Sequence, residues 1–307
     1  MNKILVTSIG GLGNQMFCYA FFKKLQIEYP DIEFKMDLSS IWDPRFERNA
    51  EFLRVFPNIN VEEACAKEIW NHEGKITFTY RGKGSRLIRK IIDTCNTFLM
   101  KSKRKKCITE ENYEQFRQCT KKLSQEDVLY FDGFWQQIAD YIEYLPQLKN
   151  DFVFSKIDDE ENQKLLQQII NENSISVHVR RGDYVGETLD ILDTSYYSKI
   201  IKEIQKENLN NKFYFFTNDP EYVEKEYAWL SQKIIVKHNT GLNSFRDMQL
   251  MSACKHNIIA NSTFSIWAAL LNPNKEKKVY YPSHYYKGIE MQDITLDGFI
   301  KIPVDEH

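Results

Sequence analysis

Several features that would assign the chain to other classes of protein are missing from its 307 residues. No long apolar run is present, because Gly10 and Gly11 interrupt the first one after a few residues, so we expect neither a signal-peptide core nor a membrane-spanning segment. A formal net charge of -2 argues against bulk nucleic-acid binding. The six cysteines form no C-x-x-C pair, which predicts reduced thiols and a cytoplasmic location.

Metal-binding patterns are missing as well. The sequence has no Asp-x-Asp pair and no histidine pair at metal-ligand spacing, so we predict neither a metal site nor a bound cofactor. What is present is the composition of a globular protein, with 42% hydrophobic and 27% charged residues. The length is sufficient for two domains, each with its own core.

Strand and helix signals alternate along the chain. Strands are predicted over residues 3–9, 32–36, 128–131, 175–179, 212–216, 234–236 and 257–260, and helices over residues 14–29, 158–173 and 266–271. This alternation favours an α/β protein with parallel sheets. We place a boundary near the acidic run at residues 158–161, which gives two Rossmann-like domains over residues 1–155 and 156–307.

One segment is strongly basic. Residues 81–106 contain ten Lys or Arg against the single acid Asp93, and their apolar side chains fall on one helical face. Such a helix can pack on the core with a solvated basic face. Alternatively, it can make a peripheral contact with an anionic membrane, here the inner membrane face, or steer an anionic substrate.

The most informative stretch is S-V-H-V-R-R-G-D at residues 176–183, where an apolar strand ends in two arginines. Ligands of open α/β sheets bind outside the carboxyl ends of the strands, and a guanidinium matches phosphate oxygens, so Arg180 and Arg181 predict an anion site. His178 precedes Arg180 by two residues and therefore points to the same face of the sheet. The alternative is a surface arginine pair bound to Asp183, with His178 packed for structure.

A second turn with the chemistry of an anion site follows the strand 257–260. Asn261, Ser262, Thr263 and Phe264 open the next helix, where hydroxyls and free backbone N–H groups converge and the helix dipole favours negative charge. Ordinary capping by Ser262 or Thr263 is the alternative. Two such turns in one half of the chain favour a shared diphosphate, whose growing charge Arg180 can stabilise without a metal.

The glycine turn at residues 10–13 has two interpretations. It is similar to a dinucleotide-binding loop, with Asp37 in the place of the ribose-binding acid, but Met16 replaces the third glycine of G-x-G-x-x-G. Alternatively, the glycines let the backbone approach a sugar, which Asn14 or Gln15 contacts.

Five segments together resemble the α1,2-fucosyltransferases of glycosyltransferase family 11. They are residues 10–17 (GGLGNQMF), 132–136 (DGFWQ), 178–184 (HVRRGDY), 215–219 (FFTND) and 261–267 (NSTFSIW), and they span nearly the whole chain. The H-x-R-R-x-D block is also similar to that of α1,6- and protein O-fucosyltransferases. The glycine opening and the N-S-T-F-S block favour the α1,2 family.

The resemblance implies a GT-B fold, in which two Rossmann-like parallel-sheet domains face a cleft. It also implies an inverting, metal-independent transfer of L-fucose from GDP-β-L-fucose to the 2-hydroxyl of a terminal β-galactoside during surface-glycan synthesis. GDP-fucose would be the co-substrate, held mainly by the C-terminal domain, and the N-terminal domain would hold the galactose-terminated acceptor glycan.

The same resemblance implies roles for individual residues. On the donor side, Arg180 and Arg181 would meet the diphosphate, Asp183 would orient them, His178 would lie beside the nucleotide, and Asn261, Ser262, Thr263 and Phe264 would complete the phosphate cradle. Asn14 would lie near the reacting sugar, with Gly11, Gly13, Gln15 and Trp135 around it on the acceptor side.

The general base is less clearly marked. Inversion in one displacement calls for a base near the acceptor hydroxyl, or for late activation of the acceptor. Glu187 follows the arginine motif as a catalytic glutamate does in the α1,6 enzymes, although its spacing differs by one residue and a solvated loop acid is the alternative. Asp190 and Asp193 are weaker candidates. Competing functions are a fucosyltransferase of another linkage, a nucleotide-dependent oxidoreductase and a non-catalytic nucleotide-sugar or glycan-binding protein.

Overall fold

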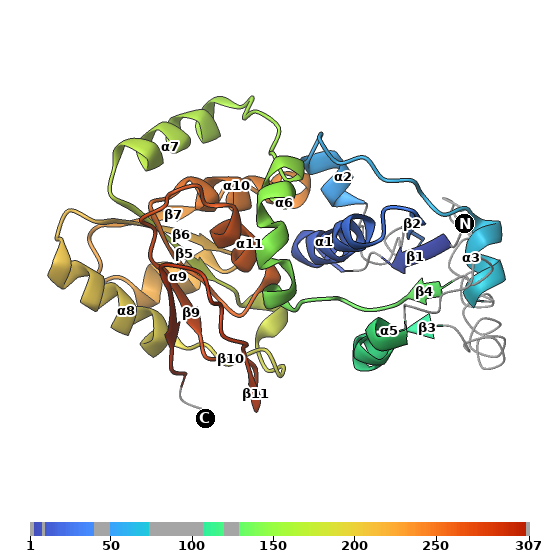
Figure 1. The fold of residues 1–307 in the computed structure, drawn as a ribbon. Coiled ribbons are helices and arrows are strands. Elements are labelled where there is room, and N and C mark those ends of the chain that lie inside the picture. Colours follow the sequence, from blue (N-terminus) through green and yellow to red (C-terminus); the bar gives the residue numbers. More distant parts are fainter. Residues whose placement is uncertain (1–2, 8–9, 40–49, 74–106, 120–128, 305–307) are drawn as a thin grey trace, which may run out of the picture. The chain divides into compact units, whose positions relative to one another are not determined.

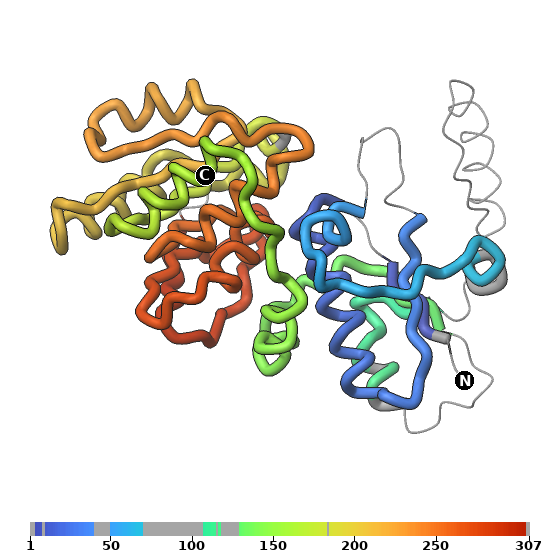
Figure 2. Tube along the Cα trace, turned by 90° about the horizontal axis from the view of Figure 1, so that it is seen from above, coloured from blue at the N-terminus to red at the C-terminus, as the bar shows by residue number. Residues whose placement is uncertain are grey.

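The structure, a computed structural model, describes residues 3–7, 10–39, 50–73, 107–119 and 129–304 (Figure 1). The chain divides into two compact units, Met1–Gln136 with Glu143–Val153 (unit 1) and Gln137–Ile142 with Phe154–His307 (unit 2). It therefore passes between units at residues 136/137, 142/143 and 153/154, where we expected one boundary. Figure 2 traces the chain through both units. The basic segment 81–106 lies outside the described residues.

Unit 1 contains a four-stranded parallel sheet in the order β2-β1-β4-β3. The strands are β1 (Lys3–Thr7), β2 (Glu33–Asp37), β3 (Cys107–Ile108) and β4 (Leu129–Phe131). The helices are α1 (Leu12–Glu28), α2 (Glu51–Val55), α3 (Ala66–Glu73), α5 (Tyr113–Cys119) and α6 (Leu145–Asp151), with a 3-10 turn at Glu110–Asn112.

Helix α1 is buried on nearly every side, because apolar residues occupy its whole circumference and such a helix belongs in a core. We expected it to begin at Asn14. It begins two residues earlier, at Leu12 with Gly11 as the N-cap, so the predicted glycine turn is shorter and Gly13 lies buried inside the helix.

Asp37, at the end of β2, belongs to the core of unit 1. It is fully buried, and its two carboxylate oxygens accept hydrogen bonds from the Tyr130 hydroxyl (2.7 Å) and the Ser39 N–H (2.8 Å). The ribose contact that the dinucleotide interpretation required of Asp37 is therefore unsupported.

Unit 2 contains a six-stranded parallel sheet and a separate antiparallel pair of short strands. The sheet strands are β5 (Ser174–Val179), β6 (Lys212–Thr217), β7 (Lys233–Val236), β8 (His256–Ile258), β9 (Val279–Pro282) and β12 (Phe299–Ile302), and the pair is β10 (His284–Tyr286) with β11 (Ile289–Glu290). The helices are α7 (Glu160–Asn171), α8 (Thr194–Glu207), α9 (Pro220–Glu226), α10 (Phe245–Ala253) and α11 (Thr263–Leu271). Short 3-10 turns cover Ile138–Tyr144, Gly182–Tyr184 and Gly241–Asn243.

The strand order of unit 2 reverses at β5. The order β12-β9-β8-β5-β6-β7 means that the chain builds β5, β6 and β7 outward, then returns to the other side of β5 for β8, β9 and β12. This is the 3-2-1-4-5-6 order of Rossmann folds. Helices α8 and α9 lie on one face of the sheet, and α7 and α10 lie on the other (Figure 1). In the part of the chain that the structure describes, no helix is both long and apolar enough to cross a bilayer.

A buried amide network joins the strands at this reversal. Asn257 of β8 is fully buried and donates to the Ser176 hydroxyl of β5 (2.7 Å) and to the Met251 carbonyl (2.9 Å). Its own amide oxygen accepts from Asn272 (2.8 Å), which also donates to the Cys254 carbonyl (2.8 Å). Because polar groups away from water are costly when unpaired, this network stabilises only the native pairing of β8 with β5.

We expect Asn257→Ala to lower the free energy of unfolding by about 3 kcal/mol, because Ser176 and Asn272 lose buried partners. The exposed Asn210 provides a matched control, for which Asn210→Ala should change stability by less than about 0.5 kcal/mol. Urea unfolding of both variants measures the difference. Equal midpoints for the two would show that the network is not stabilising.

Candidate active site

The carboxyl ends of β5 and β8 meet where the strand order of unit 2 reverses. Val177 pairs with Ile258 on one side of β5, and Val179 pairs with Thr217 on the other. The connections that leave β5 and β8 run to helices α8 and α11, and ligands of open α/β sheets bind outside the carboxyl ends of the strands at such a reversal. Both turns predicted to bind an anion leave the sheet here.

His178 brings a buried, unpartnered nitrogen to this edge. The side chain is only 5% exposed, its ring centroid lies 5.8 Å from that of Phe264 on α11, and Nδ1 has no hydrogen-bond partner among the described residues. Burial, and then the charge of Arg180, lower the pKa of His178 to about 3, so the imidazole is neutral at pH 7. An unpaired buried polar atom is rare and costly, and a bound ligand can supply the missing partner.

The two arginines of the motif have different surroundings. Arg181 is held in place: its Nε lies 3.4 Å from a carboxylate oxygen of Asp219, its Cζ lies 3.8 Å from the ring centroid of Tyr222, and its backbone N–H donates to the Asn218 side chain (2.9 Å). Arg180 is half-buried, with its Cζ 5.6 Å from the Tyr184 ring centroid. Arg181 is therefore fixed by the end of β6 and the start of α9.

Asp183 was predicted to orient these arginines. Its side chain lies outside the described residues, so that role stays a prediction. Asp219 holds Arg181 instead, which we did not predict. The sequence did mark the segment 215–219, which covers the end of β6 and the turn after it, and β6 pairs with β5. Only the register of that pairing places Asp219 beside Arg181.

The start of α11 presents backbone donors. Ser262 is the N-cap, yet its side chain makes no capping hydrogen bond, so the ordinary capping considered for it above is not what the structure contains. The first helical hydrogen bond joins the Ile266 N–H to the Ser262 carbonyl (3.0 Å). The N–H groups before Ile266 therefore lie in the first turn, ahead of the hydrogen bonds that continue along the helix. Together with the helix dipole they form a site suited to an anion.

Asn261 ties this turn to its neighbours. It is buried, and its amide nitrogen donates to the carbonyls of Leu189 (3.0 Å) and Tyr285 (2.8 Å). Both amide hydrogens are thus used inside the protein, and a donor contact from Asn261 would have to use its amide oxygen. Asn261 positions the loop after the arginine motif and strand β10 next to the start of α11.

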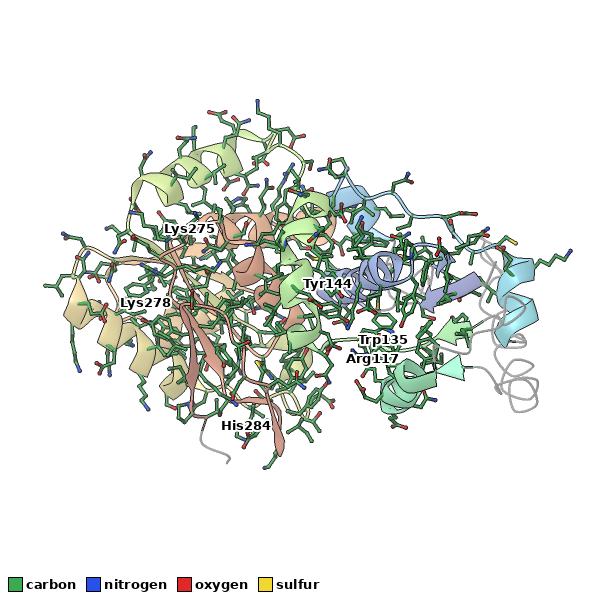
Figure 3. All side chains as sticks on the ribbon, viewed as in Figure 1. Arg117, Trp135, Tyr144, Lys275, Lys278 and His284 are labelled. Carbon is green, nitrogen blue, oxygen red and sulfur yellow. The ribbon has the colours of Figure 1, made fainter. Side chains whose placement is uncertain are left out.

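A pocket of about 590 Å³ lies along that loop and the β10–β11 pair, whose His284 is labelled in Figure 3. Its walls are Arg181, Gly186, Glu187, Thr188, Asp190, Ile191, Leu192, Asp193, Tyr222, His284, Tyr286, Lys287 and Val304. Its volume falls in the range of small-molecule sites. Strand β10, which the sequence did not predict, and Lys287 after it supply part of this wall.

The three candidate bases differ in whether their carboxylates already accept hydrogen bonds. Asp190 accepts a hydrogen bond from the Gly186 N–H (3.0 Å), and Asp193 caps α8 by accepting from the N–H groups of Ser195 (2.8 Å) and Tyr196 (3.3 Å). Glu187 is exposed on the pocket wall. Its backbone N–H donates to the Tyr184 carbonyl (2.9 Å), but its carboxylate makes no hydrogen bond or ion pair with another described residue. It is the acid of the three whose carboxylate is available.

Within the described ranges, no group of three or more His, Cys, Asp or Glu side chains is arranged to hold a metal ion.

Unit 1 has a reversal of its own, between β1 and β4. Asn14 follows β1 and Gln136 follows β4, and the Gln136 amide donates to the Asn14 amide oxygen (3.0 Å) across that point. Gly11, the half-buried N-cap of α1, lies beside Asn14 in the chain. The sheet edge of unit 1 therefore carries a pair of side-chain amides. At the corresponding edge, unit 2 carries arginine side chains and backbone N–H groups.

Two residues predicted on the acceptor side turn inward. Gln15 is fully buried, donates to the Gly10 carbonyl (3.0 Å) and accepts from the Phe52 N–H (3.2 Å), so it holds the glycine turn and does not face a ligand. Trp135, labelled in Figure 3, is 3% exposed and stacks on Phe21 with ring centroids 3.9 Å apart. The packing of these two side chains does not support direct contact with a ligand, and both contacts stay predictions.

A family model described as Glycosyl transferase family 11 matches residues 87–302. The chain belongs to this family. As a family 11 glycosyltransferase it carries the arginine motif, the N-S-T-F-S turn and, apart from Val304, the pocket wall within the matched range. The resemblance predicted from the five segments is confirmed.

Two relatives of this family 11 glycosyltransferase cover most of its length. The O-antigen biosynthesis glycosyltransferase WbnK of Escherichia coli is 28% identical over 304 residues, which is 95% of this chain and 98% of the relative. An alpha-1,2-colitosyltransferase of Escherichia coli is 30% identical over 296 residues, which is 88% of each.

Solved structures confirm the predicted GT-B fold of the family 11 glycosyltransferase. The fucosyltransferase NodZ from Bradyrhizobium matches with a TM-score of 0.51 at 15% identity, covering 89% of this chain and 93% of that one. The NodZ alpha-1,6-fucosyltransferase co-crystallised with GDP matches with a TM-score of 0.53 at 16% identity and the same coverage. The cleft expected of the fold stays a prediction.

We expect His178 to make the stability of this glycosyltransferase depend on pH. The pKa of His178 is about 3 in the folded protein and near 6.5 when unfolded, so the unfolded chain takes up the proton first as the pH falls. The free energy of unfolding should therefore drop by about 2 kcal/mol from this residue between pH 8 and pH 5.

Chemical unfolding of wild type and His178→Gln at both pH values isolates this contribution, because other titrating groups are common to the two proteins. The stability difference between them should change with pH by about that amount. Parallel pH dependence in the two proteins would contradict the neutral, buried state of His178.

Proposed function

We propose that this family 11 glycosyltransferase transfers L-fucose from GDP-β-L-fucose to the 2-hydroxyl of a terminal β-galactoside in surface-glycan synthesis, with inversion and without a metal. In this proposal residues 156–307 bind the donor and residues 1–155 bind the acceptor. The observation that carries it is the approach of His178, two residues before Arg180, to Phe264 at the start of α11, where the strand order of unit 2 reverses.

The surroundings of these groups support a diphosphate as the ligand. The helix start offers backbone donors and a positive dipole end, and Arg180 adds a fixed positive charge, while Arg181 is already bound to Asp219. His178 stays neutral, so its unpaired Nδ1 suits a polar group of the nucleotide. Family membership, and a NodZ structure soaked with GDP-fucose, support the choice of nucleotide.

The reaction breaks one bond and makes one. The acceptor oxygen attacks C1 of fucose from the face opposite the diphosphate, the bond from C1 to the β-phosphate oxygen breaks, and GDP leaves with the electron pair. Arg180 and the start of α11 stabilise the charge that grows on that oxygen. The hydroxyl proton passes to a base, for which Glu187 is our candidate because its carboxylate is unengaged. A Glu187→Gln variant with an unchanged rate of transfer would remove it from this role.

The relative at 30% identity favours a second donor. It is named an alpha-1,2-colitosyltransferase, and colitose is L-fucose without the 3-hydroxyl. A site that hydrogen-bonds the 3-hydroxyl rejects the deoxy sugar strongly, whereas an apolar site does not. The α1,2 linkage is common to both donors, so the choice between them concerns one hydroxyl group.

The direct test is to incubate the protein with GDP-fucose, lactose and excess EDTA, and to determine the linkage of the trisaccharide by NMR. We expect an α1,2-linked product, formed faster than the product from GDP-colitose in parallel reactions. A product of another linkage, or GDP binding with no sugar released or transferred, would contradict the proposal. Galactose-terminated glycans other than lactose belong in the same assay, so that one poor acceptor does not decide it.

We expect Arg180→Ala to lower kcat by about a hundredfold, the loss of roughly 3 kcal/mol that follows removal of a preorganised charge partner. Arg181→Ala should instead lower stability and raise the KM for the donor, because Arg181 connects the motif to Asp219 and Tyr222.

Arg117→Ala is the control, since Arg117 is an exposed residue in the last turn of α5, away from the arginine motif in the chain, and forms a surface ion pair with Glu114 (3.3 Å). Steady-state kinetics and thermal unfolding of the three variants separate these effects. Near-normal kcat in Arg180→Ala would refute its role.

A further inference from the structure

The chain after β4 sends two neighbouring aromatic side chains in opposite directions. Trp135 has a φ of 55°, the only positive φ of a non-glycine residue in the described part of the chain, and its indole is buried against Phe21. Phe134 is 43% exposed. Bulky residues rarely adopt this backbone region, and they persist there when the surroundings enforce it, most often at functional sites.

The surroundings of this turn do enforce it. The Trp135 N–H donates to the Glu110 carboxylate, and the Cys18 thiol donates to the carbonyls of Gly133 (3.5 Å) and Phe134 (3.9 Å). A side chain at Gly133 would place its Cβ 3.0 Å from the Glu110 carboxylate and 3.1 Å from the Trp135 indole, so only glycine fits without movement. Phe134 is therefore presented by a rigid turn.

The position of Phe134 is that of a ligand contact. It follows β4 by three residues and so lies at the carboxyl edge of the unit 1 sheet, at the reversal between β1 and β4. Two residues further on, Gln136 pairs with Asn14. An exposed aromatic face near amide groups matches a pyranose ring, whose C–H bonds suit the negative face of an aromatic ring and whose hydroxyls suit amides.

We propose that Phe134 is the stacking platform for the terminal sugar of the acceptor, a specificity role that rests on the transfer proposed above. Galactose fits such a platform because its axial 4-hydroxyl leaves the C–H bonds at C3, C4 and C5 together on one face of the ring. Trp135, which we first expected on the acceptor side, acts as the buried anchor that orients Phe134.

The experiment compares Phe134→Ala and Phe134→Tyr with wild type. In Phe134→Ala the KM for lactose should rise about tenfold, while the KM for GDP-fucose and its slow hydrolysis without acceptor stay unchanged. Phe134→Tyr keeps an aromatic face and should stay within about twofold of wild type. Trp229→Ala is the matched control, because Trp229 is an aromatic residue of unit 2 with 45% exposure, and its ring lies 5.4 Å from Lys202 Nζ and 6.5 Å from the Tyr227 ring.

Saturation-transfer NMR measures lactose binding to each protein, and this measurement does not depend on turnover. An unchanged lactose KM in Phe134→Ala would overturn the proposal, and so would an equal loss of donor hydrolysis and lactose binding, which would indicate general damage. If wild type transfers no fucose but binds lactose, and Phe134→Ala loses that binding, the platform stands and the proposed reaction fails. If wild type does not bind lactose or any galactoside, the platform for galactose is wrong.

Discussion

The site of unit 2 depends on how β8 is held against β5. The strand order reverses between these two strands, and the reversal opens the sheet edge at which His178 and the start of α11 meet. Asn257 connects the two strands through Ser176, and Asn272 connects the end of α11 to Asn257. Because every partner is buried, a shifted register would leave polar groups unpaired, and the network thereby fixes where the turn after β8 begins.

Charge in this site is divided among groups with separate tasks. Burial keeps His178 neutral, Asp219 with Tyr222 holds Arg181, and Arg180 and the dipole of α11 complete the positive groups at this sheet edge. A site built in this way stabilises developing negative charge with little reorganisation, since its dipoles are already oriented. The hydrogen bonds from Asn261 to the carbonyls of Leu189 and Tyr285 add rigidity where the pocket wall joins the start of α11.

Both units follow the same rule with different chemistry. In each, the order of parallel strands reverses next to the first strand of the sheet, and the segments after two adjacent strands meet there. Unit 2 places arginines and N–H groups at that point, which suits an anion, and unit 1 places Asn14, Gln136 and an exposed ring, which suits a neutral polar ligand. The transfer that we propose, from a donor with a charged leaving group to an uncharged sugar acceptor, would use this division.

The sequence alone located seven of the ten strands of the two sheets, missing β3, β9 and β12, and it placed the anion motifs at strand ends, because apolar runs and turn residues are local signals. It also determined the family, since short motifs survive where overall identity is low. Only the tertiary structure decided the directions of side chains: Trp135 turns inward at a positive φ and Phe134 outward, Gln15 is used by the core, and Asp219 holds Arg181. These outcomes depend on strand register and on partners that are distant in the chain. Phe52 lies 37 residues from Gln15, and Asp219 lies 38 residues from Arg181, so no local sequence pattern contains both partners.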